Sequence, residues 1–108
     1  MIEQARLVHV APALRRYIVD LVAATRRHGD VYLGASPRAS MMILRAARAF
    51  AAAEERDFVI PDDVKVLAVP VLAHRIIVTA DAVMTGRSTE VILQEILAEV
   101  PVPIAENP

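Results

Sequence analysis

Apolar residues recur at three- and four-residue spacing along most of the chain, which is the pattern of amphipathic helices. The clearest run lies between Pro12 and His28. Its apolar face consists of Leu14, Tyr17, Ile18, Leu21, Val22 and Thr25. We expect this helix to stop at Gly29, where a left-handed C-terminal cap costs glycine little.

A second helix is predicted to begin in the stretch GASPRAS, residues 34–40. Ser36 is a typical N-cap, because its hydroxyl can accept from the free N–H groups of a first turn, and Pro37 suits the first helical position. From Pro37 to about Glu55 follows a broad apolar stripe of Met41, Ile43, Leu44, Ala46, Ala47, Phe50 and Ala51. The preceding stretch GDVYLGAS is expected to be a loop.

Two further helices complete the pattern. Pro61 begins a third helix with core positions Val64, Leu67, Ala68, Val71 and Leu72, and Pro70 inside it predicts a kink or a break. Ser88 is expected to cap a last helix through Val100, with Val91, Ile92, Leu93, Ile96 and Leu97 directed inward. Between them, the β-branched run RIIVT predicts a short extended segment near residues 75–79 without an evident partner strand.

Composition supports an all-α fold. Hydrophobic residues make up 56% of the 108 residues and aromatic residues only 4%, so the core must use small aliphatic side chains. We therefore expect a small four-helix bundle in a single domain over residues 1–108, with 1–10 as a leading segment and the proline-rich 101–108 as an extended tail. The absence of cysteine removes disulfides and is compatible with the cytoplasm, where we expect the protein. No apolar run approaches the roughly 20 residues of a membrane span.

Few residues offer chemistry. The histidines His9, His28 and His74 are scattered without metal-ligand spacing, so no metal site is expected. The chain has three glycines and no glycine-rich phosphate loop, and no serine has an evident base, so no catalytic residue is expected in this chain. The net charge of −1 provides no overall field that would attract nucleic acid.

Arg38 is unusual by position. It would lie in the first turn of the second helix, where the helix dipole disfavours a cation and favours an anion. A guanidinium offers donors matched to phosphate oxygens, and the free N–H groups of the same turn favour an anion too. From the residues alone, two interpretations stay open: a phosphate contact, or an exposed side chain that extends into water.

Four ordered stretches, LVAATR, LGASPRA, RAARAFAAAEERDFVIPDDV and VLAHRI, follow the pattern of one family. Together they resemble the C-terminal lid region of MoxR-type AAA+ ATPases, and the stretch STEVILQEILAEVPVP also fits. One departure is Ile60, where the family often has a Thr or Ser cap before the proline. This departure would weaken the third helix start by about 1 kcal/mol.

The resemblance implies that the chain is part of a longer ATPase whose upstream domain binds ATP and Mg²⁺. In such a protein the lid packs over the nucleotide, and the arginine of the motif Gly34, Ser36, Pro37 and Arg38 acts as sensor 2. The lid would then contact the upstream domain and neighbouring subunits of a ring, commonly a hexamer. It would couple ATP hydrolysis to chaperone-like maturation of client proteins, while the chain alone would not hydrolyse ATP.

Two other functions compete with this expectation. A free-standing helical module that binds a protein partner, without a nucleotide role, fits the composition equally well. DNA binding through a helix-turn-helix or histone-like packing is suggested by VIPDDVKVLA, but the near-neutral charge and the acidic start of the third helix argue against it.

Overall fold

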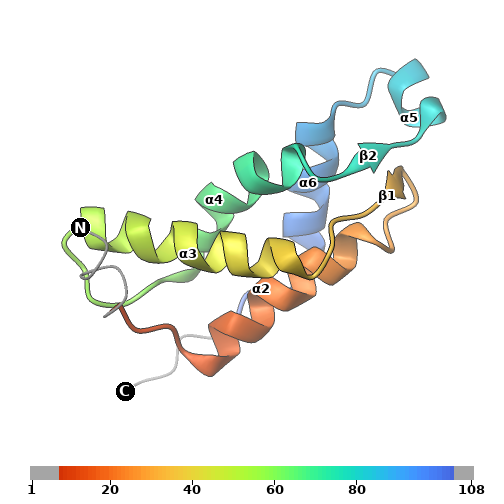
Figure 1. Cartoon of the computed structure of the whole chain (residues 1–108). Coiled ribbons are helices and arrows are strands. Elements are labelled where there is room, and N and C mark those ends of the chain that lie inside the picture. Colours follow the sequence, from red (N-terminus) through yellow and green to blue (C-terminus); the bar gives the residue numbers. More distant parts are fainter. Residues whose placement is uncertain (1–7, 104–108) are drawn as a thin grey trace.

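Four long helices surround one hydrophobic core in the computed structural model, which describes residues 8–103 (Figure 1). The element order is α2 (Pro12–Thr25), β1 (Val31–Leu33), α3 (Arg38–Ala53), α4 (Pro61–Ala73), β2 (Ile77–Val78), α5 (Ala80–Met84) and α6 (Thr89–Glu99). Helix α3 contacts α2 and α4, and α6 contacts α4 and α2, so the long helices close a ring of contacts. The predicted bundle is confirmed in its four long helices, while α5 and a two-stranded sheet were not predicted.

The core is built mainly from aliphatic side chains of the four long helices. All six positions predicted on the first helix are buried in α2. Their partners from the other long helices include Ile43, Leu44, Ala47, Val64, Ala68, Leu72, Ile92, Leu93 and Ile96. Because Ala47 and Ala51 have small side chains and are fully buried, α3 can lie close to its neighbours.

The predicted end of the first helix needs two corrections, one in its position and one in its cap. Helix α2 ends at Thr25, not at Gly29, and the residues with left-handed φ in the described part of the chain are Glu55 and Gly86. The chain turns after α2 through a side-chain contact, since the N–H of Asp30 donates to Nδ1 of His28 at 3.0 Å. A left-handed glycine is therefore not needed there.

Three further details differ from the predicted pattern. Helix α4 continues through Pro70 without a break, and Pro70 lies on its exposed side. Pro70 has no N–H to donate to the carbonyl four residues earlier, and on the exposed side of the helix water can donate to that carbonyl instead. Met41 and Val91, both predicted to point inward, are half exposed because each lies at the edge of its apolar stripe.

The expected loop before the second helix contains a strand. β1 pairs antiparallel with β2, with Val31 opposite Val78 and Leu33 opposite Ile77 across an irregular register. The extended segment predicted near 75–79 is thereby confirmed, and its partner is found 44 or more residues earlier in the chain. Helix α5 follows directly, capped by the Thr79 hydroxyl, which accepts from the N–H of Ala82 at 3.1 Å.

The sheet and α5 form one end of the elongated molecule, away from the start of α2 (Figure 1). Several large apolar side chains are exposed at this end, which we call the apolar tip: Tyr32, Leu33, Ile77, Val83 and Met84. Near the start of α2, His9 forms a parallel bridge to Phe58, and Val8 and Val10 are buried. Residues 8–10 of the expected leading segment thus belong to the fold, whereas 1–7 and 104–108 lie outside the described residues. No helix among residues 8–103 has the length and apolar character needed to cross a membrane.

Candidate functional site

Arg38 is the first residue of α3, and its side chain is exposed. It forms no ion pair with any acidic side chain of residues 8–103. The first turn of α3 also contains no acidic residue that could occupy the positive end of the helix dipole. Within residues 8–103, no acidic side chain therefore neutralises the Arg38 guanidinium.

Ser36 does not cap α3 with its side chain, contrary to the prediction. Pro37, the residue directly before α3, already has helical φ and ψ of −56° and −23°, and no side chain forms a cap hydrogen bond at this helix start. Backbone groups close this turn instead: Ala39 N–H donates to the carbonyl of Ser36 at 2.9 Å, and Ser40 N–H to that of Pro37 at 3.0 Å.

The segment before Arg38 lies against the last turn of α2. The N–H of Ala35 donates to the hydroxyl oxygen of Thr25 at 3.0 Å, and Nη1 of Arg26 donates to the Ala35 carbonyl at 2.9 Å. Ala35 and Thr25 are both fully buried. At Gly34 an added Cβ would lie 2.6 Å from Cγ of Arg26, so only glycine fits this contact without a shift.

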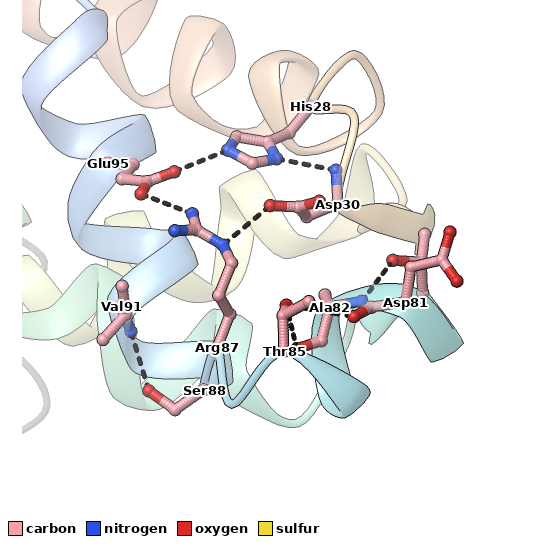
Figure 2. A network of polar contacts seen from close by, with 10 residues as sticks. His28, Asp30, Asp81, Ala82, Thr85, Arg87, Ser88, Val91 and Glu95 are labelled. Atoms are coloured by element: carbon pink, nitrogen blue, oxygen red, sulfur yellow. Dashed lines mark hydrogen bonds and ion pairs between the residues drawn. The ribbon is translucent and has the colours of Figure 1, made fainter.

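A second polar cluster joins the end of α2 to α6 (Figure 2). Arg87, from the α5–α6 connection, donates from Nε to Oδ2 of Asp30 at 2.8 Å, and its Nη2 contacts the carboxylate of Glu95. His28 Nε2 lies 3.1 Å from Oε1 of Glu95. Because His28 Nδ1 accepts from Asp30 N–H, Nε2 is the nitrogen that carries the proton and donates to Glu95.

These contacts set the protonation behaviour of the cluster. Hydrogen bonds from Arg87 and then from His28 hold the pKa of Glu95 below its usual value of 4.5. The two carboxylates raise the pKa of Arg87, with the hydrogen bond to Glu95 as the largest cause. Glu95 is therefore ionised at neutral pH, and its contacts with Arg87 and His28 link α6 to the end of α2.

The same cluster brings together groups that could ligate a cation. Ligand atoms of His28, Asp30 and Glu95 lie within 4.8 Å of one another. The expectation of no metal site considered spacing within one helix, and could not reveal a contact between residues 67 positions apart. In this arrangement the Arg87 guanidinium already contacts both carboxylates, so the geometry is that of an ion-pair network.

Comparison with known proteins assigns the domain. Residues 23–96, more than half of the chain, match the AAA lid domain. The chain belongs to the AAA lid domain family. The matched span contains the start of α3 with Arg38 and also the Arg87 cluster, so both features lie within the lid domain itself.

The lid domain is similar to parts of several longer proteins. It is 41% identical over 100 residues to the uncharacterized protein YeaC of Bacillus subtilis, covering 93% of this chain and 31% of that protein. It is 40% identical over 100 residues to chaperone MoxR1 of Mycobacterium tuberculosis, covering 84% and 26%, and 42% identical over 81 residues to protein MoxR of Paracoccus denitrificans, covering 63% and 24%.

A solved structure has the same fold. The crystal structure of a candidate ATPase from Cytophaga hutchinsonii superposes with a TM-score of 0.87 at 33% identity, covering 94% of the lid domain and 34% of that chain. The lid domain therefore spans about a third or less of the length of the relatives it matches. The resemblance to MoxR-type lids is confirmed over most of the chain.

Proposed function

We propose that this chain is the lid of a MoxR-type AAA+ ATPase and that Arg38 is its sensor 2 arginine, which contacts the phosphates of ATP. The observation that carries the proposal is the exposed guanidinium at the start of α3, without an acidic partner among residues 8–103, in a domain of the AAA lid family. A phosphate brought to this helix start would gain both a charge-assisted hydrogen bond and a favourable dipole.

The donor set of this helix start fits phosphate oxygens and does not fit Mg²⁺. Arg38 supplies only N–H donors, and the first turn of α3 contains no carboxylate, which is the ligand that Mg²⁺ requires. ATP would supply the phosphoanhydride that is hydrolysed, and Mg²⁺ would be held by the upstream nucleotide-binding domain. Within this chain, Arg38 binds and orients phosphate, and Gly34, Ser36 and Pro37 form the backbone that leads to it.

The proposed lid role requires contacts with other protein domains, and the exposed apolar tip is a surface suited to such contacts. Tyr32 and Met84 are 78% and 84% exposed, an unusual display of large apolar side chains at one end of a small domain. We assign as partners the upstream domain of the same chain and neighbouring subunits of a cytoplasmic ring, a hexamer. Residues 1–108 would act as one domain that couples ATP binding and hydrolysis to chaperone-like maturation of client proteins.

The decisive experiment replaces Arg38 in the full-length ATPase. We expect Arg38→Ala to lower ATP turnover at least about tenfold, because a charge-assisted contact to the reacting phosphate is lost. Arg45→Ala is the matched control, since Arg45 is an exposed arginine two turns later on the same helix. Equal turnover in the Arg38 and Arg45 variants would refute the sensor 2 assignment. The 108-residue chain alone should show no ATP hydrolysis.

The apolar tip also supports a second function, that of a free-standing protein-interaction module in which Arg38 has no nucleotide role. The two functions predict different gene organisations. A Gly-Lys-Ser or Gly-Lys-Thr phosphate loop upstream in the same reading frame supports the ATPase lid. A reading frame that starts at Met1 supports the module.

A further inference from the structure

We infer that Thr25 and Arg26 are positioning residues for Arg38, because together they hold both backbone polar groups of Ala35, three residues before it. This inference rests on the proposed sensor 2 role of Arg38. It concerns how the lid positions Arg38, whose exposed side chain has no ion pair among residues 8–103 that would fix its direction.

At Ala35, side-chain contacts take the place of the backbone hydrogen bonds that a helix or strand would provide. Ala35 lies between β1 and α3, yet it is fully buried, so its N–H and carbonyl both need partners. Thr25 accepts from the N–H and Arg26 donates to the carbonyl, at 3.0 and 2.9 Å. The backbone of Ala35 is therefore fixed to the last turn of α2 by two side chains that follow one another in the sequence.

The Thr25 hydroxyl is itself oriented. It donates to the carbonyl of Val22 at 2.6 Å, so its hydrogen is used within α2 and its lone pairs face Ala35. Packing adds to this restraint, because Gly34 lies so close to α2 that an added Cβ would be 2.8 Å from the Arg26 backbone. The segment can move neither along α2 nor away from it without losing these contacts.

Little freedom remains between Ala35 and Arg38. Only Ser36 and Pro37 lie between them, and the proline ring fixes one of their φ angles near −65°. Beyond Arg38, Ala39 and Ile43 are buried and anchor α3 in the core. Since Arg38 has no ion pair among residues 8–103, its direction depends on this backbone. A displacement of about 1 Å at a reacting group can cost about a hundredfold in rate.

Variants of Thr25 in the full-length ATPase test the functional part. Thr25→Val keeps the shape and removes the hydroxyl, and we expect ATP turnover to fall about tenfold. Thr25→Ser keeps the hydroxyl and should retain wild-type turnover. Ser88→Ala is the control: it removes a hydroxyl that caps α6, a helix that contributes neither to the start of α3 nor to the apolar tip, and it should leave turnover unchanged.

A double variant separates positioning from general damage to the fold. If Thr25 acts through Arg38, then Thr25→Val combined with Arg38→Ala should be no slower than Arg38→Ala alone, within about twofold. If the double variant instead loses turnover by the product of the two single-variant factors, the inference is overturned, while the sensor 2 role of Arg38 remains intact. Wild-type turnover in Arg38→Ala would instead refute the proposed function.

Amide exchange in the 108-residue chain tests the contact directly. We expect Thr25→Val, and to a smaller extent Arg26→Met, to accelerate hydrogen exchange at Ala35 at least about tenfold, with Thr25→Ser close to wild type. Exchange at buried amides of α6 serves as the control for global unfolding. Unchanged exchange at Ala35 in Thr25→Val would overturn the inference whatever the turnover measurements show.

Discussion

Arg56 and Asp63 form a bidentate ion pair across the connection between α3 and α4. Nη1 of Arg56 donates to Oδ2 of Asp63 and Nη2 to Oδ1, each at 2.7 Å, and Asp63 is only 1% exposed. Oδ2 also accepts from the N–H of Ile60 at 2.9 Å. Asp63 therefore supplies a contact at the helix start that Ile60, which has no polar side chain, cannot supply, and this offsets the weak cap expected there.

The first prediction concerns this pair. Arg56→Ala should clearly lower the free energy of unfolding, because it leaves the Asp63 carboxylate, which is 1% exposed, without its cation. Urea unfolding of the 108-residue chain measures the loss. Arg45→Ala, an exposed arginine without an ion pair among residues 8–103, should change stability by less than about 0.5 kcal/mol. Similar losses in the two variants would contradict a structural role for the pair.

The second prediction compares two glycines. Gly34→Ala should destabilise the fold by about 2 kcal/mol, because the new Cβ would meet Cγ of Arg26 at 2.6 Å and its backbone at 2.8 Å. Gly29→Ala should be neutral or slightly stabilising, since its Cβ would meet nothing within 4 Å and its φ is not left-handed. Thermal unfolding of both variants checks the contrast, and a neutral Gly34→Ala would show that α2 and the Gly34 segment are not in close contact.

Local periodicity predicted the helices well. All six positions assigned to the face of α2 are buried, and four of the five assigned to α6 are, since a 3.6-residue repeat reports directly which side of a helix meets the core. The position of Arg38 at the start of α3 also followed from local signals, because proline and small polar residues mark helix starts.

Contacts between distant residues could not be predicted in this way. Strands of three and two residues carry too little pattern to reveal that Val31 pairs with Val78. The contact between His28 and Glu95 likewise depends on how α6 packs against α2. The hydrogen bonds that Thr25 and Arg26 form with Ala35 were missed for a further reason: Thr25 already had a local explanation as a core position of the first helix.

The third prediction uses two serines with the same expected role. Ser88 accepts from the N–H of Val91 at 3.1 Å and caps α6 as predicted, whereas Ser36 makes no cap contact at α3. Ser88→Ala should therefore cost about 1 kcal/mol of stability, and Ser36→Ala about zero. The midpoint of urea unfolding distinguishes the two. A cost of about 1 kcal/mol for Ser36→Ala would mean that its hydroxyl does cap α3 in solution.

The fourth prediction is an acid-dependent loss of stability that originates at Glu95. Because contacts from Arg87 and His28 hold the pKa of Glu95 below 4.5, the folded chain keeps this carboxylate charged to a lower pH than the unfolded chain does. Between the two pKa values the unfolded state binds more protons, so acid favours unfolding. The stabilisation from Glu95 is present in full above its usual pKa and is lost as the pH falls through the lowered value.

Glu95→Gln should therefore be less stable than wild type at pH 6, and over a titration from pH 6 to about pH 3 the difference should shrink once the pH falls below the usual pKa of 4.5. Arg87→Ala removes the largest cause of the lowered pKa, so in that background Glu95→Gln should show a much weaker pH dependence. Urea midpoints measured across this range provide the comparison. A wild-type to Glu95→Gln difference that stays constant from pH 6 to pH 3 would mean that the Arg87 contact does not lower the pKa of Glu95 in solution, and the cluster would then hold α6 to α2 by packing alone.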